Sequence, residues 1–267
     1  GGVCLNWGCI PSKALIRNSE VVNLFKNAEE FGISADNVQY DYSKAVDRSR
    51  NVVNKLTSGI DLLLSRNGVK VIKGEGTLID RNTISVNEQL ISSENIIIAT
   101  GATFREIPGL PIDGSTIITS RDALALQEVP KRVVIVGAGA TGVEFGYLYN
   151  AYGTKVTLIE AMERLLPGED HEISKELEAA LLKQGVNSLL NSTASIEEMH
   201  NNKVKLKISG VGEEKELTVD KVLISVGMEG NTSCIDRNNL DIGIQKGFIN
   251  VNNQMETNLK GIYAVGD

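Results

Sequence analysis

The chain has 267 residues and a formal net charge of −7, and 42% of its residues are hydrophobic. This composition is typical of a globular protein with one large domain or two modest ones. The sequence contains neither a concentrated Lys/Arg patch nor an apolar run of membrane-spanning length, so we expect no nucleic-acid and no membrane partner. Three cysteines do not form a secreted disulfide framework in a chain of this length, and we predict no metal site.

The first thirteen residues contain two cysteines, Cys4 and Cys9, followed by Pro11 and a helical pattern. In a regular α-helix, residues five apart have Cα atoms about 8–9 Å apart, whereas a disulfide usually needs Cα atoms within about 7 Å. If Cys4 and Cys9 are bonded, residues 4–9 therefore cannot form a regular helix. The alternative is a pair of free thiols, the usual state in a reducing compartment. The flanking glycines and the Pro-Ser-Lys sequence favour the bonded pair.

The next hundred residues predict two helices and then a series of short strands. Apolar residues recur with helical spacing over 11–31 and 43–66. The short β-rich runs lie at 69–73, 76–79, 83–86, 89–91 and 94–99. Two prolines and two glycines within residues 104–118 then predict a linker between domains.

A glycine-rich segment, Gly137-Ala-Gly-Ala-Thr-Gly142, follows a β-branched run at 132–136 that is typical of a buried parallel strand. A predicted helix through Tyr152 and a second strand at 155–160 come next. The pattern G-x-G-x-x-G is weak evidence alone, but between a strand and a helix it indicates dinucleotide binding.

Each glycine of this segment has a predicted task. Gly137 allows a tight turn, Gly139 lets the backbone approach a pyrophosphate, and Gly142 permits close packing of helix and strand. The helix N-terminus offers N–H groups to the phosphates. Glu160, 23 positions after Gly137, is placed to accept hydrogen bonds from a ribose diol, and the alternative is a solvated carboxylate at a strand end.

The remainder of the chain predicts a helix and further strands. The helix covers 172–184, and the strands lie near 187–190, 193–199, 203–209 and 215–226, with a return segment at 247–267. Residue 1 is Gly and lies inside a motif, and the last residues predict a buried strand running into a turn. We therefore expect an internal piece of a longer chain.

Several motifs, in order along the whole chain, resemble those of the dihydrolipoamide dehydrogenases, which belong to the flavin-dependent disulfide oxidoreductases. These motifs are Cys4 to Lys13, Ala99-Thr-Gly101, the glycine-rich segment, Ser225-Val-Gly227 and Tyr263-Ala-Val-Gly-Asp267. The resemblance implies an α/β fold with two Rossmann-like nucleotide-binding domains. The FAD-binding domain, incomplete here, would comprise residues 1–111 and the return segment 242–267, and the NAD-binding domain would be inserted as 112–241.

The resemblance also implies roles for the residues around the dithiol. Cys4 would exchange with the substrate, and Cys9 would be left as a thiolate against the flavin. Lys13 would pair with Glu144 near the flavin. From the residues alone, Lys13 is equally a solvated helix lysine, and Glu144 could close a capping box with Thr141.

Further positions match cofactor contacts of the same proteins. Gly76, Thr100, Gly101 and Asp267 match contacts to FAD, and Ala194 and Gly227 match contacts to NAD. Many relatives carry Gly-Arg-x-Pro-Asn where this chain has Gly227-Met-Glu-Gly-Asn231, so a cation and a proline are replaced at the NAD pocket. We expect His171 and His200 at the surface and Cys234 to be an inert thiol.

The function implied by the resemblance is oxidation of protein-bound dihydrolipoamide, with FAD and NAD as cofactors. The partner would be the lipoyl domain of a 2-oxo-acid dehydrogenase or glycine-cleavage complex, and the parent protein would be a homodimer in the cytoplasm, or in the mitochondrial matrix of a eukaryote. One alternative is a related reductase of the glutathione or mercuric type. Another alternative applies to a polypeptide limited to these 267 residues. We expect it to be an inactive module that binds NAD and carries no FAD.

Overall fold

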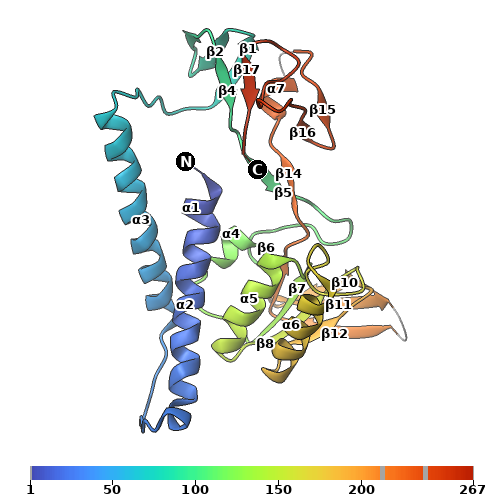
Figure 1. The fold of residues 1–267 in the computed structure, drawn as a ribbon. Helices are drawn as coiled ribbons and strands as arrows, with labels where there is room; N and C mark the ends of the chain where they lie inside the picture. Colours follow the sequence, from blue (N-terminus) through green and yellow to red (C-terminus); the bar gives the residue numbers. More distant parts are fainter. Residues whose placement is uncertain (1, 211–213, 237–239, 267) are drawn as a thin grey trace. The chain divides into compact units, whose positions relative to one another are not determined.

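A computed structural model describes residues 2–210, 214–236 and 240–266. The chain divides into two compact units, each built from two segments (Figure 1). Unit 1 comprises Gly1–Ser58 and Glu106–Gly227, and unit 2 comprises Gly59–Arg105 and Met228–Asp267. These units are defined by contacts between segments. The predicted domains are defined instead by the nucleotide that each would bind. The predicted domain boundaries at residues 111 and 241 therefore stay a prediction.

The centre of unit 1 is a five-stranded parallel sheet. Its strands, in spatial order, are β6 (Ile117–Thr119), β13 (Lys221–Ile224), β7 (Arg132–Val136), β8 (Lys155–Ile159) and β9 (Asn187–Leu189). Side chains alternate between the two faces of a strand, so Val133 and Ile135 of β7 enter one hydrophobic core and Val134 and Val136 enter another. Both faces of the sheet are thus covered, as the β-branched run predicted.

Helices cover one face of this sheet (Figure 1). Helix α5 (Ala140–Ala151) contributes Phe145, Leu148 and Tyr149 to the core on that face, and α6 (His171–Lys183) contributes Leu181. Helix α2 (Cys9–Lys26) packs against α5 and adds Leu15. The long helix α3 (Tyr42–Arg66) adds residues of its first turns, and the short helix α4 (Ser120–Ala123) follows β6.

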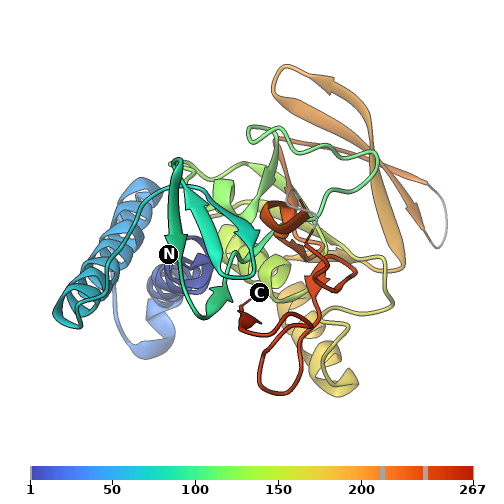
Figure 2. The ribbon, with the colours of Figure 1, turned by 90° about the horizontal axis from the view of Figure 1, so that it is seen from above.

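An antiparallel sheet covers the opposite face (Figure 2). It consists of β10 (Ser192–His200), β11 (Lys203–Gly210) and β12 (Lys215–Val219). Val204, Leu206 and Ile208 of β11 alternate along the strand and are buried in the second core. On its outer side, hydrogen bonds from Lys205 to Glu197 and Glu216 raise the pKa of the lysine to about 12, so these ion pairs join all three strands.

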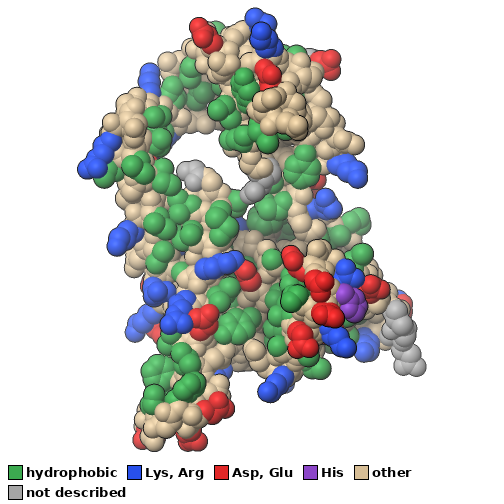
Figure 3. All heavy atoms as spheres, in the orientation of Figure 1, with side chains coloured by type: hydrophobic (Ala, Val, Ile, Leu, Met, Phe, Trp, Pro, Cys, Tyr) green, Lys and Arg blue, Asp and Glu red, His purple; other side chains and the backbone are tan. Residues whose placement is uncertain are grey.

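The end of α2 and the short 3-10 helix Ala28–Phe31 carry exposed hydrophobic side chains (Figure 3). These are Leu24, Phe25 and Phe31, with Ile33 and Tyr40 in the connection to α3. The helix predicted over 11–31 therefore ends earlier, at Lys26, and the core of unit 1 does not extend to this tip.

Unit 2 is built mainly from short strands. β1 (Gly76–Asp80), β2 (Thr83–Val86) and β3 (Gln89–Ser92) form an antiparallel sheet, and β4 (Ile96–Ile98) forms a separate parallel pair with β17 (Ile262–Ala264). The remaining elements are β5 (Ala102–Phe104), β14 (Met228–Gly230), β15 (Ile244–Gln245), β16 (Phe248–Ile249) and α7 (Ser233–Asp236). Leu78, Ile98 and Ile262 lie in its core. Segments far apart in the sequence thus share one core.

Three sequence predictions are wrong in detail. Residues 69–73 form no strand, and Val69 and Val71 are exposed. The strand predicted over 215–226 is interrupted at Asp220, whose carboxylate accepts a hydrogen bond from the backbone N–H of Arg132, so β12 and β13 belong to different sheets. The predicted linker 104–118 includes part of β6, an edge strand of the parallel sheet.

Within the described parts of the chain, no helix combines the length and apolar character needed to cross a membrane. The same residues contain no group of three or more His, Cys, Asp or Glu side chains arranged to hold a metal ion.

Candidate functional site

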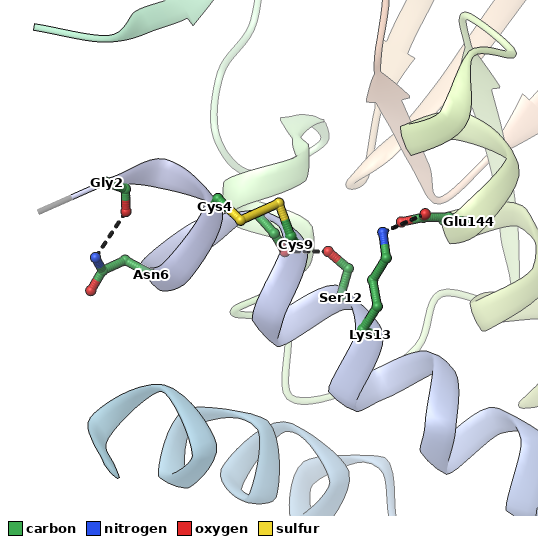
Figure 4. The surroundings of a disulfide bond; sticks show 8 residues. Gly2, Cys4, Asn6, Cys9, Ser12, Lys13 and Glu144 are labelled. Atoms are coloured by element: carbon green, nitrogen blue, oxygen red, sulfur yellow. Dashed lines mark hydrogen bonds and ion pairs between the residues drawn. A yellow bond between two sulfur atoms is a disulfide. The ribbon is translucent and has the colours of Figure 1, made fainter. Parts of the chain in front are cut away.

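The two cysteines lie on either side of a break between two helices (Figure 4). Helix α1 (Val3–Trp7) ends at Gly8, and α2 begins at Cys9. The Cα atoms of Cys4 and Cys9 are 4.6 Å apart and their sulfur atoms are bonded. A Cβ at position 8 would lie 3.1 Å from the Cα of Cys4, so glycine permits this close approach. The prediction that residues 4–9 cannot form a regular helix is confirmed.

The environment of Cys9 favours a thiolate. Cys9 is the first residue of an 18-residue helix, and the positive end of a helix macrodipole stabilises a negative charge placed there. The hydroxyl of Ser12 donates to the carbonyl of Gly8, which fixes the backbone at the break (Figure 4). Both cysteines are exposed.

Lys13, one turn further along α2, forms an ion pair with Glu144 of α5 (Figure 4). Their Nζ and Oε1 atoms are 2.6 Å apart. The capping box considered for Glu144 is absent, because α5 begins after Gly139 and has no side-chain cap. The ion pair implied by the resemblance is present. It connects α2, which carries Cys9 of the dithiol, to α5, which follows the glycine-rich turn.

The glycine-rich turn between β7 and α5 requires glycine at two positions. Gly137 has φ +97°, in a region that favours glycine, and a Cβ there would lie 2.5 Å from the carbonyl oxygen of Ser225. A Cβ at Gly142 would overlap the carbonyl of Gly137. Because α5 lacks a side-chain cap at Gly139, the N–H groups of its first turn can face a phosphate.

Glu160 directly follows β8, contacts the glycine-rich turn and is only 8% exposed. Its Oε2 accepts a hydrogen bond of 2.7 Å from the N–H of Ala138, and its Oε1 accepts one of 2.9 Å from the N–H of Met162. The solvated carboxylate considered from the sequence is therefore wrong. Contact between Glu160 and a ribose stays a prediction, and it would use the lone pairs that the backbone leaves free.

The residues that directly follow Glu160 line a pocket of about 240 Å³. It is lined by residues 161–164, Pro167 and Asn191. Arg164, four residues after Glu160, lies on the wall of this pocket. Its guanidinium donates to Glu163 and to the carbonyl of Pro167, so its charge is partly neutralised by a carboxylate.

Ser225, which directly follows β13, contacts the glycine-rich turn and was not among the predicted site residues. Its hydroxyl lies 2.7 Å from the carbonyl oxygen of Gly137 and 3.0 Å from that of Val136, and it donates to one of them at a time. This contact joins the end of β13 to the glycine-rich turn. In the sequence, the motif Ser225-Val-Gly227 was the only feature that drew attention to this residue.

Unit 2 contains its own pocket, of about 240 Å³, lined by Thr100, Gly101 and Gly266 among others. Thr100 donates its hydroxyl to the carbonyl of Asn231 at 2.6 Å, and the N–H of Asn231 donates to Gly101 at 2.9 Å. Asn231 also lines this pocket and was not among the predicted site residues.

The other predicted site residues are not gathered in this pocket. Gly76 begins β1, pairs with Val86 and is not among the residues that line it. Asp267 lies outside the described residues. In unit 1, Ala194 lies in β10 opposite Ile208, and Gly227 follows β13 with φ +102°.

The two histidines and the third cysteine belong to other elements than the two helices that carry the dithiol. His171 begins α6 and His200 ends β10, and both are exposed, as predicted. Cys234 lies in α7 and is partly buried, outside the disulfide.

Comparison with known proteins identifies relatives along the whole chain. A family model described as pyridine nucleotide-disulphide oxidoreductase matches residues 1–267. Proteins named dihydrolipoyl dehydrogenase are similar to the entire chain, at 40% identity in Chlorobaculum tepidum, 36% in Bacillus subtilis and 37% in Acholeplasma laidlawii. The chain spans 58%, 60% and 79% of these proteins, respectively.

A solved structure agrees with the sequence comparison. The HOCl-induced flavoprotein disulfide reductase RclA from Escherichia coli matches with a TM-score of 0.83 at 29% identity. The match covers 100% of this chain and 57% of the RclA chain.

Proposed function

Because the chain belongs to the pyridine nucleotide-disulphide oxidoreductase family, we propose that the protein containing it is a flavin-dependent dihydrolipoamide dehydrogenase. It would oxidise protein-bound dihydrolipoamide through the Cys4–Cys9 disulfide and FAD, with NAD as the final acceptor. The observation that carries this proposal is the break at Gly8, which holds an exposed Cys4 beside a Cys9 that begins a helix.

The exchange step follows from the position of Cys9. A substrate thiolate forms a bond to the sulfur of Cys4, and the Cys4–Cys9 bond breaks. Cys9 leaves with the electron pair as a thiolate, because the N-terminus of α2 stabilises its negative charge. The second substrate thiolate then displaces Cys4. One dithiol is oxidised to a disulfide, two electrons remain on the cysteines, and the two thiol protons pass to Cys4 and the solvent.

The residues present fit a pyridine nucleotide. The glycine-rich turn leaves the first N–H groups of α5 without a side-chain cap, and the close contacts at Gly137 and Gly142 shape a tight loop for a pyrophosphate. Glu160, Ala194 and Gly227 would complete the site. A carboxylate at the ribose favours the 2′-hydroxyl of NAD and disfavours the 2′-phosphate of NADP.

The predicted FAD contacts are Gly76, Thr100, Gly101 and Asp267, together with the Lys13–Glu144 pair. Thr100 and Gly101 line a pocket, Gly76 and Asp267 would add contacts, and the Lys13–Glu144 pair would lie near the flavin. When bound, FAD supplies a two-electron relay between a dithiol and a pyridine nucleotide. The role of this chain is to hold the cysteines close, to keep Cys9 as a thiolate and to fix Lys13.

The same proposal specifies partners and place. The substrate group would be carried on the lipoyl domain of a 2-oxo-acid dehydrogenase or glycine-cleavage complex. The protein would be a homodimer in the cytoplasm, or in the mitochondrial matrix of a eukaryote.

A second candidate is a related disulfide reductase, and the similarity to RclA favours it. The test is turnover of the full-length protein. We expect rapid reduction of NAD by dihydrolipoamide and little oxidation of NADPH by glutathione disulfide. The reverse preference would reject the dehydrogenase and support the reductase.

A further inference from the structure

Two arginines from distant parts of the chain meet Trp7, inside the segment between the reactive cysteines. The guanidinium carbon of Arg50, in α3, lies 4.3 Å from the centroid of the Trp7 ring. That of Arg121, in α4, lies 5.1 Å from it. A guanidinium over an indole ring is the most favourable cation–π arrangement. Trp7 also packs against the main core of unit 1.

Arg50 holds the backbone of the same segment. Its Nη1 donates a hydrogen bond of 2.9 Å to the carbonyl of Asn6. One side chain thus contacts both the ring of Trp7 and the peptide before it, and these residues form the last turn of α1 before the break at Gly8. Because Cys4 belongs to this helix, any motion of α1 would move its sulfur relative to Cys9.

The Arg50 guanidinium also carries unused hydrogen-bonding capacity. Its Nε and Nη2 atoms are buried and have no hydrogen-bond partner among the described residues. Burial lowers the pKa of Arg50, but a guanidinium stays charged at neutral pH. A cation that is only partly hydrated interacts more strongly with a nearby negative charge than a solvated one does.

We propose that Arg50 and Arg121, acting through Trp7, are positioning residues for Cys4 and Cys9 and stabilise the reduced, anionic form of this pair. The inference rests on the proposed use of these cysteines as a redox couple. Cys4, Trp7 and Cys9 are separated by only a few residues, which places the guanidinium groups on the order of 10 Å from the sulfurs. This distance is about one Debye length, so dissolved salt screens the interaction only in part. Stabilising the reduced form makes the disulfide a stronger oxidant of its substrate.

The test measures the redox equilibrium of the full-length protein with dithiothreitol at pH 7. In this reaction the dithiothreitol dithiol becomes a cyclic disulfide while Cys4–Cys9 gains two electrons and becomes a dithiol. Quenching with an alkylating agent and counting the modified cysteines by mass spectrometry gives the equilibrium constant. Dithiothreitol replaces lipoamide, so the result does not depend on the identity of the natural substrate.

Arg50→Met keeps an aliphatic side chain over Trp7 and removes the charge. We expect its equilibrium constant for reduction to fall about tenfold, which is about 30 mV for a two-electron couple. Arg50→Lys should recover most of this loss. Lys55→Met is the matched control, because it removes an exposed positive charge from the same helix and should change the constant less than twofold.

Two results would overturn the inference. One is an Arg50→Met protein that melts as a folded protein and has the equilibrium constant of the control. The other is an Arg50→Lys protein as deficient as Arg50→Met, which would show that charge is not the cause. If Arg50→Met does not fold, Arg121→Met decides, since Arg121 is exposed: a shift in the same direction supports the inference, and an unchanged constant overturns it. If the variants show these shifts but the wild-type protein has no lipoamide turnover, only the proposed function is rejected.

Discussion

Lys13 and Glu144 form an ion pair of 2.6 Å between helices that begin at two different motifs. Lys13 follows the dithiol on α2, and Glu144 follows the glycine-rich turn on α5. The Lys13 side chain is 61% exposed and that of Glu144 is 29% exposed. A pair this accessible to solvent contributes little to stability, at most about 1 kcal/mol. If Lys13 acts at the flavin as proposed, we therefore expect the ion pair to position the lysine charge and to contribute little to stability.

Lys13→Met in the full-length protein should separate these two effects. We expect lipoamide turnover to fall at least about tenfold, whereas the free energy of unfolding should change by less than about 1 kcal/mol. Arg17→Met is the control, because Arg17 forms an equally short pair with Glu20 on the same helix. Equal turnover in the two variants would contradict a role for Lys13 at the flavin.

The dithiol assignment is tested by three serine variants of the full-length protein. Cys4→Ser and Cys9→Ser should each abolish lipoamide turnover, because the exchange needs both sulfurs. Cys234→Ser should leave turnover nearly unchanged, since Cys234 lies in α7, outside the disulfide. Near-normal turnover in Cys9→Ser would reject the assignment of the redox couple.

Features that depend on neighbouring residues could be predicted from the sequence. The run Arg132–Val136 is buried on both sides of a parallel sheet, as its unbroken β-branched composition predicted. The break between Cys4 and Cys9 followed from a geometric limit on disulfides and from the glycines beside them. The Lys13–Glu144 pair was implied only by resemblance.

Features that depend on distant partners could not be predicted. Arg50 contacts Asn6 and Trp7 more than forty residues earlier, and no local pattern marks it among the other charged residues of α3. Ser225 is positioned by the end of β7, and Asp220 interrupts a strand because it accepts from Arg132. In each case the partner is brought close by the fold, which periodicity and spacing do not describe.

Glu160 should set the choice of pyridine nucleotide. We predict that the full-length protein binds NAD at least about tenfold more tightly than NADP, a difference of about 1.4 kcal/mol. The carboxylate would accept from the ribose 2′-hydroxyl and repel a 2′-phosphate. Titration calorimetry with the two cofactors measures this, and equal or reversed affinities would show that the carboxylate is not at the ribose.

Glu160→Gln should weaken both NAD binding and the fold. Each carboxylate oxygen accepts a backbone N–H, so one of these donors would face the amide NH₂ of glutamine and lose its partner. We expect the free energy of unfolding to fall by about 1–3 kcal/mol. The ratio of the affinities for NAD and NADP should also decrease. Glu163→Gln is the control, because this exposed carboxylate pairs with Arg164 and leaves the turn intact. An equal effect of the two variants on stability would contradict the role of Glu160 in the turn.

Tyr42, at the start of α3, has a buried hydroxyl with no hydrogen-bond partner among the described residues. Its ring packs edge-on against Tyr152, with centroids 5.0 Å apart. Tyr42→Phe keeps this contact and removes the unsatisfied group, so we expect it to raise the free energy of unfolding by about 1 kcal/mol at neutral pH. Tyr40→Phe, at a position that is 40% exposed, should have no such effect.

The same variant should change the response of the protein to alkaline pH. Burial, and to a lesser degree Tyr152, raises the pKa of the Tyr42 hydroxyl above its usual range. The unfolded chain releases this proton near pH 10, whereas the folded chain retains it. Ionisation of Tyr42 therefore leaves the free energy of unfolding unchanged below about pH 10. As the pH rises from there toward the folded pKa, the ionisation lowers this free energy. Urea unfolding at pH 8 and pH 11 should show a smaller loss of stability in Tyr42→Phe than in the wild type or Tyr40→Phe, and equal losses in all three would contradict the burial of an un-ionised Tyr42.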